Sequence, residues 1–336
     1  MKKKLVVALA LSMALSLCAC GGSASESGTG AKEEAVSASE QENDKEEDVD
    51  VVESEESKES ITAGSTEDSA EMSAENVSKS DSNDINFQST VLVDNDECAI
   101  TIKEIDPNDA WGYTLKAMLE NKSSEKTYMF SVESAYVNGV SADPLFATTV
   151  AAGKKANENI TFMNDSLEKA GITDFTDIEL RFRVYNDNGE EDPIVNDTFH
   201  IYPYGEDKAE KYVRTPADTD NVLVDDDHVS VIVTGYSEDE FGDYNVELYL
   251  VNKTDNSVMY SVDNASINGI MADPFYACEL AANKCAFSTI SWTKDILEEN
   301  GIETVEEIEL PFKAYENDEI NFDGETYVEE VFTLNP

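Results

Sequence analysis

The run SVESAYVNGVSADPLFA, residues 131–147, recurs as SVDNASINGIMADPFYA, residues 261–277, with nine identities in seventeen positions. The match continues upstream and downstream of both runs with a shift of about 130 residues. Two copies at this spacing are two whole domains rather than the short units of a solenoid. We therefore expect one domain over residues 86–204, a second over residues 218–336, and a flexible linker at residues 205–217.

Apolar and polar residues alternate along short runs in each copy. Leu180, Phe182 and Val184, for example, alternate with Arg181 and Arg183. This period of two is typical of strands with one buried face. Seven or eight such runs in about 118 residues suit a β-sandwich. The sequence therefore predicts an all-β fold class: two tandem immunoglobulin-like antiparallel β-sandwiches that fold independently.

One short helix is expected in each copy, over residues 165–170 and residues 294–299. Gly171 and Gly301 follow these segments directly, where a left-handed residue commonly ends a helix. A strand, a one-turn helix and another strand form a common corner of immunoglobulin-like sandwiches.

The series Asn138-Gly139, Asp143-Pro144 and Gly171-Ile172 resembles the uncharacterised immunoglobulin-like domains of surface lipoproteins from Gram-positive anaerobes. The resemblance covers both copies and implies a fold and a cell-surface address, but no catalytic residues. The second copy departs from it at Asn283, where the first copy has Gly153, and at Pro311 within an expected strand. Pro311 indicates an edge strand or a bulge, because proline cannot donate a ladder hydrogen bond.

The first twenty residues have the pattern of a bacterial lipoprotein signal. Three lysines precede the apolar run Leu5 to Leu17, which is too short to span a membrane and is typical of a signal peptide. Leu17 and Ala19 stand at −3 and −1 relative to Cys20, as in a lipobox. We expect a signal peptide over residues 1–19 and a lipidated Cys20; the alternative is an ordinary secretory signal with a coincidental cysteine.

Residues 20–85 differ in composition from everything that follows. No aromatic residue occurs before Phe87, and residues 21–85 hold 20 acidic and 4 basic side chains. Such a segment cannot bury enough apolar surface to offset the entropy of ordering it. We predict a disordered acidic linker that serves as a tether; binding of cations or basic peptides by this segment is the alternative.

The remaining chain is also acidic, with 52 acidic and 16 basic side chains after residue 85. This charge argues against nucleic acid as a partner and against docking onto anionic lipid headgroups. The chain has two histidines, and no G-x-S-x-G, H-E-x-x-H or glycine-rich phosphate motif occurs. The sequence therefore predicts that the protein is not an enzyme.

Calcium is the one cofactor that the carboxylates could hold, and only weakly. One acidic turn carries Asp94 and Asp96, and its repeat counterpart carries Asp225 and Asp227. A second candidate is an EF-hand-like run that includes Asp323, although its flanks are expected to be strands rather than helices. A solvated acidic turn is the competing interpretation at the first two places, and a hairpin turn at the third.

Two aromatic residues are candidate ligand contacts. Trp111 and Phe241 follow acidic loops at matching positions of the two copies. Each could stack on a sugar ring or a cationic peptide, or could fold back as a lid over the edge of the sandwich. Cys278 and Cys285 flank an expected hairpin tip, where an exported protein could form a disulfide.

Together these features predict a protein anchored by lipid on the extracytoplasmic face of the bacterial cell membrane. We expect a non-enzymatic binding or adhesion module whose ligand is a surface protein, a peptide or a glycan. A structural envelope scaffold without a ligand is the first alternative, and a calcium-binding surface module is the second.

Overall fold

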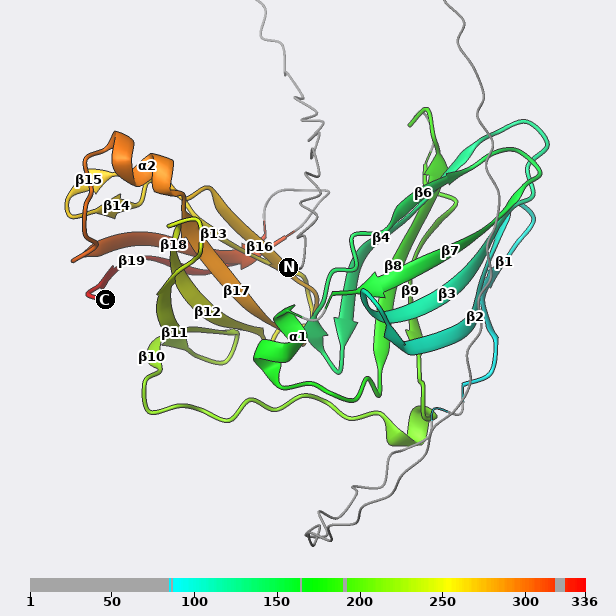
Figure 1. Ribbon diagram of the computed structural model, residues 1–336, viewed down its shortest axis with the longest axis horizontal. Coiled ribbons are helices and arrows are strands. Elements are labelled where there is room, and N and C mark those ends of the chain that lie inside the picture. The colour runs from blue at the N-terminus through cyan, green and yellow to red at the C-terminus, as the bar shows by residue number, and fades with distance from the viewer. Residues whose placement is uncertain (1–84, 86, 164, 190–191, 318–323) are drawn as a thin grey trace, which may run out of the picture. The chain divides into compact units, whose positions relative to one another are not determined.

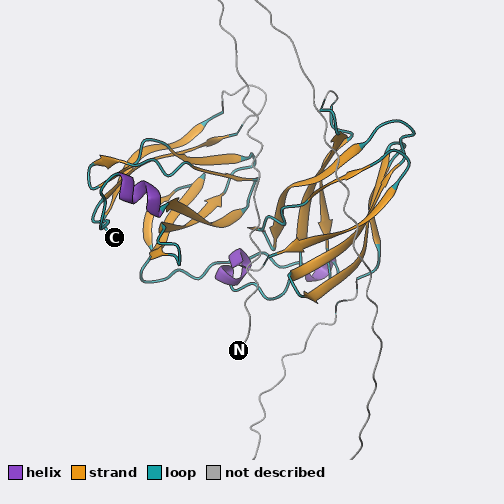
Figure 2. Cartoon of the chain, turned by 45° about the horizontal axis from the view of Figure 1, so that its top comes forward, coloured by secondary structure: helices purple, strands orange, loops and turns teal. Residues whose placement is uncertain are grey.

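The computed structural model describes residues 85, 87–163, 165–189, 192–317 and 324–336. Strands dominate this part of the chain, with a few short helical segments between them (Figures 1 and 2). The elements are β1 (Thr90–Asp94), β2 (Cys98–Asp109), β3 (Gly112–Asn121), β4 (Tyr128–Val137), β5 (Val140–Ser141), β6 (Ala147–Val150), β7 (Lys155–Phe162), α1 (Asp165–Ala170), β8 (Ile178–Asn186), β9 (Val195–Ile201), the 3₁₀ helix η1 (Glu206–Lys208), β10 (Asn221–Asp225), β11 (Val229–Glu238), β12 (Tyr244–Asn252), β13 (Val258–Val262), β14 (Ser266–Ile267), β15 (Ile270–Met271), β16 (Tyr276–Leu280), β17 (Cys285–Trp292), α2 (Lys294–Glu299), β18 (Ile308–Glu316) and β19 (Thr326–Leu334).

The first copy is a sandwich of two antiparallel sheets. One sheet has the order β1-β2-β3-β7, and the other places β4 between β8 and the short strands β5 and β6, with β9 outside β8. Apart from the additional strand β1, this is the order of an immunoglobulin-like sandwich: β2, β3 and β7 take the places of strands A, B and E, and β6, β4, β8 and β9 those of C′, C, F and G. The predicted fold is confirmed.

The second copy repeats this arrangement. Its strands β10, β11, β12 and β17 form one layer, and β16, β13, β18 and β19 form the other. The largest difference lies in the strand that corresponds to β4, because here it is divided into β13 and β14. The break leaves residues 263–265 outside the ladder opposite Pro311. Pro311 therefore lies inside a central strand rather than at an edge, and the extra residue opposite it agrees with the bulge that was the other expectation. The broken partner accommodates its missing N–H.

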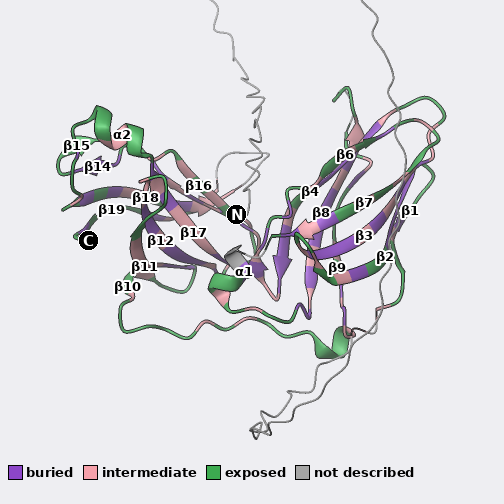
Figure 3. Ribbon diagram, in the orientation of Figure 1, coloured by how far each residue is buried: buried purple, intermediate pink, exposed green. Residues whose placement is uncertain are grey.

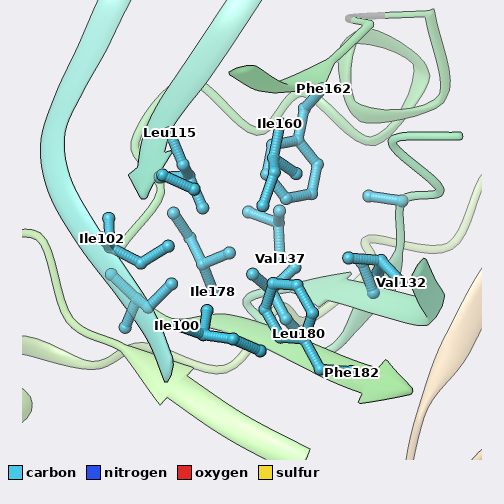
Figure 4. Close-up of a cluster of buried hydrophobic side chains, with 14 of the residues drawn as sticks. Ile100, Ile102, Leu115, Val132, Val137, Ile160, Phe162, Ile178, Leu180 and Phe182 are labelled. Atoms are coloured by element: carbon cyan, nitrogen blue, oxygen red, sulfur yellow. The ribbon is translucent and has the colours of Figure 1, made fainter. Parts of the chain in front are cut away.

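Alternation along the strands produces the two cores. In β8, Ile178, Leu180, Phe182 and Val184 are fully buried, and the residues between them face outward. Figure 4 shows Leu180 and Phe182 packed among Ile100, Ile160 and other apolar side chains of the first core. In both sandwiches the buried residues lie along the strands (Figure 3). Burial of this apolar surface, at about 25 cal/mol per Å², is the main force holding each sandwich together.

The predicted helices and turns are present. Helices α1 and α2 have the predicted bounds, and the glycines that follow them are left-handed, with φ of 68° at both Gly171 and Gly301. Asn138 and Gly139 both have positive φ, as expected for the turn between β4 and β5. The predicted hairpin around residues 281–284 is wrong, because β16 and β17 belong to different sheets. Cys278 and Cys285 therefore stand in opposite layers as free thiols.

One buried asparagine in each copy closes the end of the sandwich. The Nδ2 group of Asn252 donates to the carbonyls of Asn256, Leu280 and Ala281 at 2.7, 3.0 and 3.0 Å. Its counterpart Asn121 donates to the carbonyls of Lys126 and Val150, both at 2.8 Å. Because a buried carbonyl without a donor is costly, these amides explain why Asn recurs here.

The two sandwiches exchange residues between their cores. They lie within one compact unit, Asn76–Pro336. Tyr136 is a residue of β4 in the first sandwich, but its side chain packs in the core of the second. There its hydroxyl accepts a hydrogen bond from the Ala281 N–H at 2.8 Å. In return, Tyr249 and Cys285 of the second sandwich belong to the core of the first. The Cys285 N–H also donates to the Gly139 carbonyl at 3.1 Å, which joins β17 to β5 in a continuous nine-stranded sheet.

The segment between the sandwiches is held against them. The Tyr212 N–H donates to the Asn138 carbonyl at 2.8 Å, and Arg214 forms two hydrogen bonds of 2.6 Å with the carboxylate of Asp220. This bidentate contact lowers the pKa of Asp220 to about 2. The flexibility of the linker stays a prediction. Whether each sandwich folds alone stays a prediction, as do the domain boundaries.

We predict that Tyr136 couples the unfolding of the two sandwiches. Replacing Tyr136 with Ala removes an aromatic ring that is 3 % exposed, and such deletions cost about 3–5 kcal/mol. Differential scanning calorimetry of residues 21–336 should show one transition for the wild type and two for Tyr136→Ala. Tyr136→Phe is the control: it keeps the ring, loses one hydrogen bond worth about 1 kcal/mol, and should retain a single transition. A single unshifted transition for Tyr136→Ala would refute the coupling.

Candidate binding surface

The two aromatic residues singled out in the sequence are exposed. Trp111 connects β2 to β3 and has 81 % of its surface exposed; Phe241, in the matching connection of β11 to β12, has 73 % exposed. Neither covers the edge of its sandwich, so the interpretation as lids over the core is wrong. Both side chains are therefore available to a ligand.

A second matching pair was missed by the sequence analysis. Leu145, between β5 and β6, is 75 % exposed, and Phe275, between β15 and β16, is 97 % exposed. They occupy the same position in the run that defines the repeat, directly after Asp143-Pro144 and Asp273-Pro274. The sequence indicated a turn at both places and gave no reason to expect the apolar residue to be solvent-exposed.

The same local structure presents all four side chains, which we call the four tips: Trp111, Leu145, Phe241 and Phe275. In each case, the Oδ1 atom of an aspartate two residues earlier accepts the N–H of the tip residue. The distances are 3.1 Å from Trp111 to Asp109, 2.8 Å from Leu145 to Asp143, 2.9 Å from Phe241 to Asp239 and 3.2 Å from Phe275 to Asp273. This Asx turn fixes the backbone by a side chain from the turn itself.

Two of the tips hold a backbone conformation that bulky residues avoid. Leu145 has φ of 47° and Phe275 has φ of 53°. The other non-glycine residues with positive φ in the described chain are all asparagines: Asn138, Asn264, Asn268 and Asn283. A left-handed conformation costs most residues about 1–2 kcal/mol, and asparagine is among the exceptions. Both copies thus have a large apolar residue at a position where Asn or Gly would be favoured, because the side chain is exposed to solvent and the backbone is left-handed.

In each acidic turn that was a candidate for calcium, a lysine pairs with one of the carboxylates. Lys253 Nζ lies 2.7 Å from Asp225 Oδ1, and Lys122 forms the equivalent ion pair with Asp94. Asp96 and Asp227 are exposed. Within the described ranges, no group of three or more His, Cys, Asp or Glu side chains is arranged to hold a metal ion. These features favour the solvated-turn interpretation.

Two predicted sites, Cys20 and Asp323, lie outside the described residues. In the part of the chain that the structure covers, no helix is long and apolar enough to cross a bilayer.

The two histidines are far apart in the sequence and have separate partners. His200 Nδ1 lies 2.8 Å from Asp177 Oδ1, and its Nε2 lies 3.4 Å from Glu179 Oε2. Both ring nitrogens of His200 thus face carboxylates, an arrangement that places no hydroxyl or thiol nucleophile against either nitrogen. The ring of His228 stacks on Tyr327, with 5.0 Å between the ring centres. The three thiols Cys98, Cys278 and Cys285 all have pKa values raised by burial, the opposite of an activated nucleophile.

Comparisons with known proteins do not assign the chain to a group. No protein-family model and no curated protein matches it. The exposed tips and their backbone geometry are therefore the observations from which a function can be argued.

We predict that Leu145→Asn and Phe275→Asn each stabilise the protein by about 1 kcal/mol, because asparagine tolerates the left-handed backbone. The measurement is the midpoint of urea unfolding of residues 21–336. Trp111→Asn is the matched control: Trp111 is an exposed tip on the same kind of Asx turn, but it is not left-handed, so its replacement should give no such gain. Equal midpoints for the wild type, Leu145→Asn and Phe275→Asn would contradict the prediction.

Proposed function

We propose that this protein is a lipid-anchored extracytoplasmic surface protein whose sandwiches act as a non-enzymatic binding or adhesion module. The observation that carries the proposal is the set of four tips. Large apolar side chains are exposed at matching positions of both copies. Two of them, Leu145 and Phe275, also have a left-handed backbone, which such residues disfavour. Strained backbone of this kind is concentrated at functional sites.

The tips have the properties of interface anchors. A few large side chains usually dominate the energy of an interface, and aromatic residues are frequent among them. Here each tip is held by its Asx turn, so little backbone freedom would be lost when a partner covers it. Covering a side chain as exposed as Phe275 would also remove a large apolar surface from water, which favours association.

Duplication strengthens such a module. Two weak contacts on one molecule raise the effective concentration for the second contact to the millimolar range, without any new interaction. The coupling of the two cores adds to this effect, because it limits the relative movement of the sandwiches.

Charge narrows the class of partner. With 52 acidic and 16 basic side chains after residue 85, the sandwiches would repel nucleic acid and anionic headgroups. A surface protein, peptide or glycan with a neutral or basic face remains as the ligand. A structural envelope scaffold without a ligand is the first alternative. Calcium binding is the second alternative, and the paired lysines in the acidic turns weigh against it at those turns.

Affinity capture with tip variants tests the binding proposal. Residues 21–336 are immobilised and exposed to solubilised cell-envelope material, beside the double variants Trp111→Ala/Phe241→Ala and Leu145→Asn/Phe275→Asn. Val331→Asn serves as the control, because Val331 is 63 % exposed but lies within β19 rather than on an Asx turn. We expect a partner enriched by the wild type and the control, and reduced at least about tenfold with one or both double variants.

Two outcomes of this capture would contradict the proposal. If all four proteins enrich the same partners equally, the tips are not the binding surface. If the wild type enriches nothing above an empty matrix, the scaffold alternative is favoured.

The lipid anchor is tested separately. We expect cells fed with a clickable fatty acid to label the wild-type protein, and Cys20→Ala to abolish the label, because the acyl chains would be attached to that cysteine. Cys98→Ala is the control for the loss of a cysteine elsewhere and should keep the label, since Cys98 is a buried thiol of the first core. Equal labelling of the wild type and Cys20→Ala would contradict lipidation at this residue.

A further inference from the structure

A groove of about 770 Å³ is lined by residues of both sandwiches and is separate from the four tips. From the first sandwich, β4, β8 and β9 contribute Glu133, Arg181 and Asn196. From the second, Ser257 and Glu279 contribute the opposite wall. The volume suits a small ligand or a short peptide segment.

Arginine is scarce in this chain, which makes its placement here informative. The chain has 72 acidic residues and only three arginines, Arg181, Arg183 and Arg214. Arg214 forms an ion pair with Asp220, whereas Arg181 and Arg183 both line the groove. Because these two residues are separated by one position in β8, they share the outer face of the sheet.

The two arginines differ in their contacts: Arg181 forms no ion pair with a described residue, whereas Arg183 forms one at the long distance of 4.0 Å. Arg181 Nε donates to Asn196 Oδ1 at 3.0 Å, and among the described residues no carboxylate lies within ion-pair distance of Arg181. The Arg183 guanidinium lies over the Tyr185 ring at 4.5 Å, and its nearest described carboxylate, Glu133, is 4.0 Å away. Arg181, which is bonded through Nε alone, keeps its two outer nitrogens for a bidentate bond to a carboxylate.

The second sandwich contributes a carboxylate to the groove. Glu279 is exposed, its Oε1 atom accepts the hydroxyl of Ser257 at 2.7 Å, and no described lysine or arginine pairs with it. One groove thus holds two arginines on β8 and Glu279 on β16 that are not paired with each other. The other two carboxylates that line it already have cationic partners: Glu133 contacts Arg183, and Glu179 pairs with Lys284.

The groove is not a general feature of the repeated fold. At the positions that match Arg181 and Arg183, the second sandwich has Pro311 and Lys313. Lys313 is neutralised by Glu329, with Nζ and Oε1 3.3 Å apart. The two arginines therefore occur in the copy whose β8 lines a groove shared with the other copy, and Arg181 has no carboxylate within ion-pair distance among the described residues.

We propose that this groove binds a short zwitterionic peptide segment, with a carboxylate on Arg181 and Arg183 and an ammonium group on Glu279. This charge pattern favours a ligand that carries both a negative and a positive group. A simple anion would leave Glu279 without a cationic partner and would be repelled by its carboxylate. This inference does not depend on the tips, since it concerns other residues on another surface.

Isothermal titration calorimetry of residues 21–336 tests the proposal with capped peptides. The probes are acetylated, amidated peptides containing one Lys and one Glu separated by zero to three alanines, so that the two side chains carry the only charges. We expect one spacing to bind best. Replacing Glu by Gln or Lys by norleucine in that probe should each weaken binding at least about tenfold, the effect of losing a charge-assisted hydrogen bond.

The matched protein variants are Arg181→Gln, Glu279→Gln and Lys313→Gln. The first two should weaken binding of the best probe at least about tenfold, and Lys313→Gln should leave it unchanged. Their thermal melting temperatures, measured in parallel, should agree with that of the wild type, which separates loss of binding from loss of fold. The inference is overturned if no spacing binds, if the uncharged probes bind equally, if a neutral oligosaccharide competes for the same site with higher affinity, or if Arg181→Gln binds like the wild type.

Discussion

The packing of Tyr136 into the neighbouring sandwich is the constraint on which the larger architecture depends. Its ring lies in a core to which its own strand does not belong, and its hydroxyl accepts the Ala281 N–H. Burial raises the pKa of Tyr136 to about 12, so the hydroxyl stays protonated at physiological pH. Ala281 lies between β16 and β17, and the same short connection carries Lys284, which pairs with Glu179 of β8. Tyr136 and the Lys284–Glu179 ion pair therefore both join the two sandwiches beside the groove.

The repeat and the period-two alternation were sufficient to predict each sandwich by itself. They depend on local chemistry: a strand with one buried face must alternate, as Ile178 to Val184 do, and a helix of one turn needs a residue such as Gly171 after it. The Asn-Gly turn is equally local, because few other pairs accept positive φ at both positions. For this reason the all-β fold, both helices and the main turn could be predicted without a structure.

What the sequence could not predict is what depends on residues distant in the chain. Nothing near Tyr136 in the sequence indicates a partner at residue 281, and nothing near Cys285 indicates that its N–H will donate to Gly139. The hairpin expected between Cys278 and Cys285 failed for the same reason: its sequence suits a tight turn, but the two strands belong to different sheets. Pro311 indicated an edge strand or a bulge, and the sequence of β18 could not decide between them, because the irregularity lies in the partner strand at residues 263–265.

The four tips lie between these cases. Exposure of Trp111 and Phe241 was one of two interpretations of the sequence, whereas the sequence indicated only a turn before Leu145 and Phe275. Neither an acidic loop nor an Asp-Pro turn shows whether the following apolar side chain packs inward or outward. The decisive information is the combination of φ and exposure at Leu145 and Phe275. A turn needed only to reverse the chain would be cheaper with Asn or Gly, as Asn138, Asn268 and Asn283 illustrate elsewhere in the same fold. Leu145 and Phe275 are costly for the backbone and leave most of their side chains in solvent, and this combination is the physical basis of the proposal that they contact a partner.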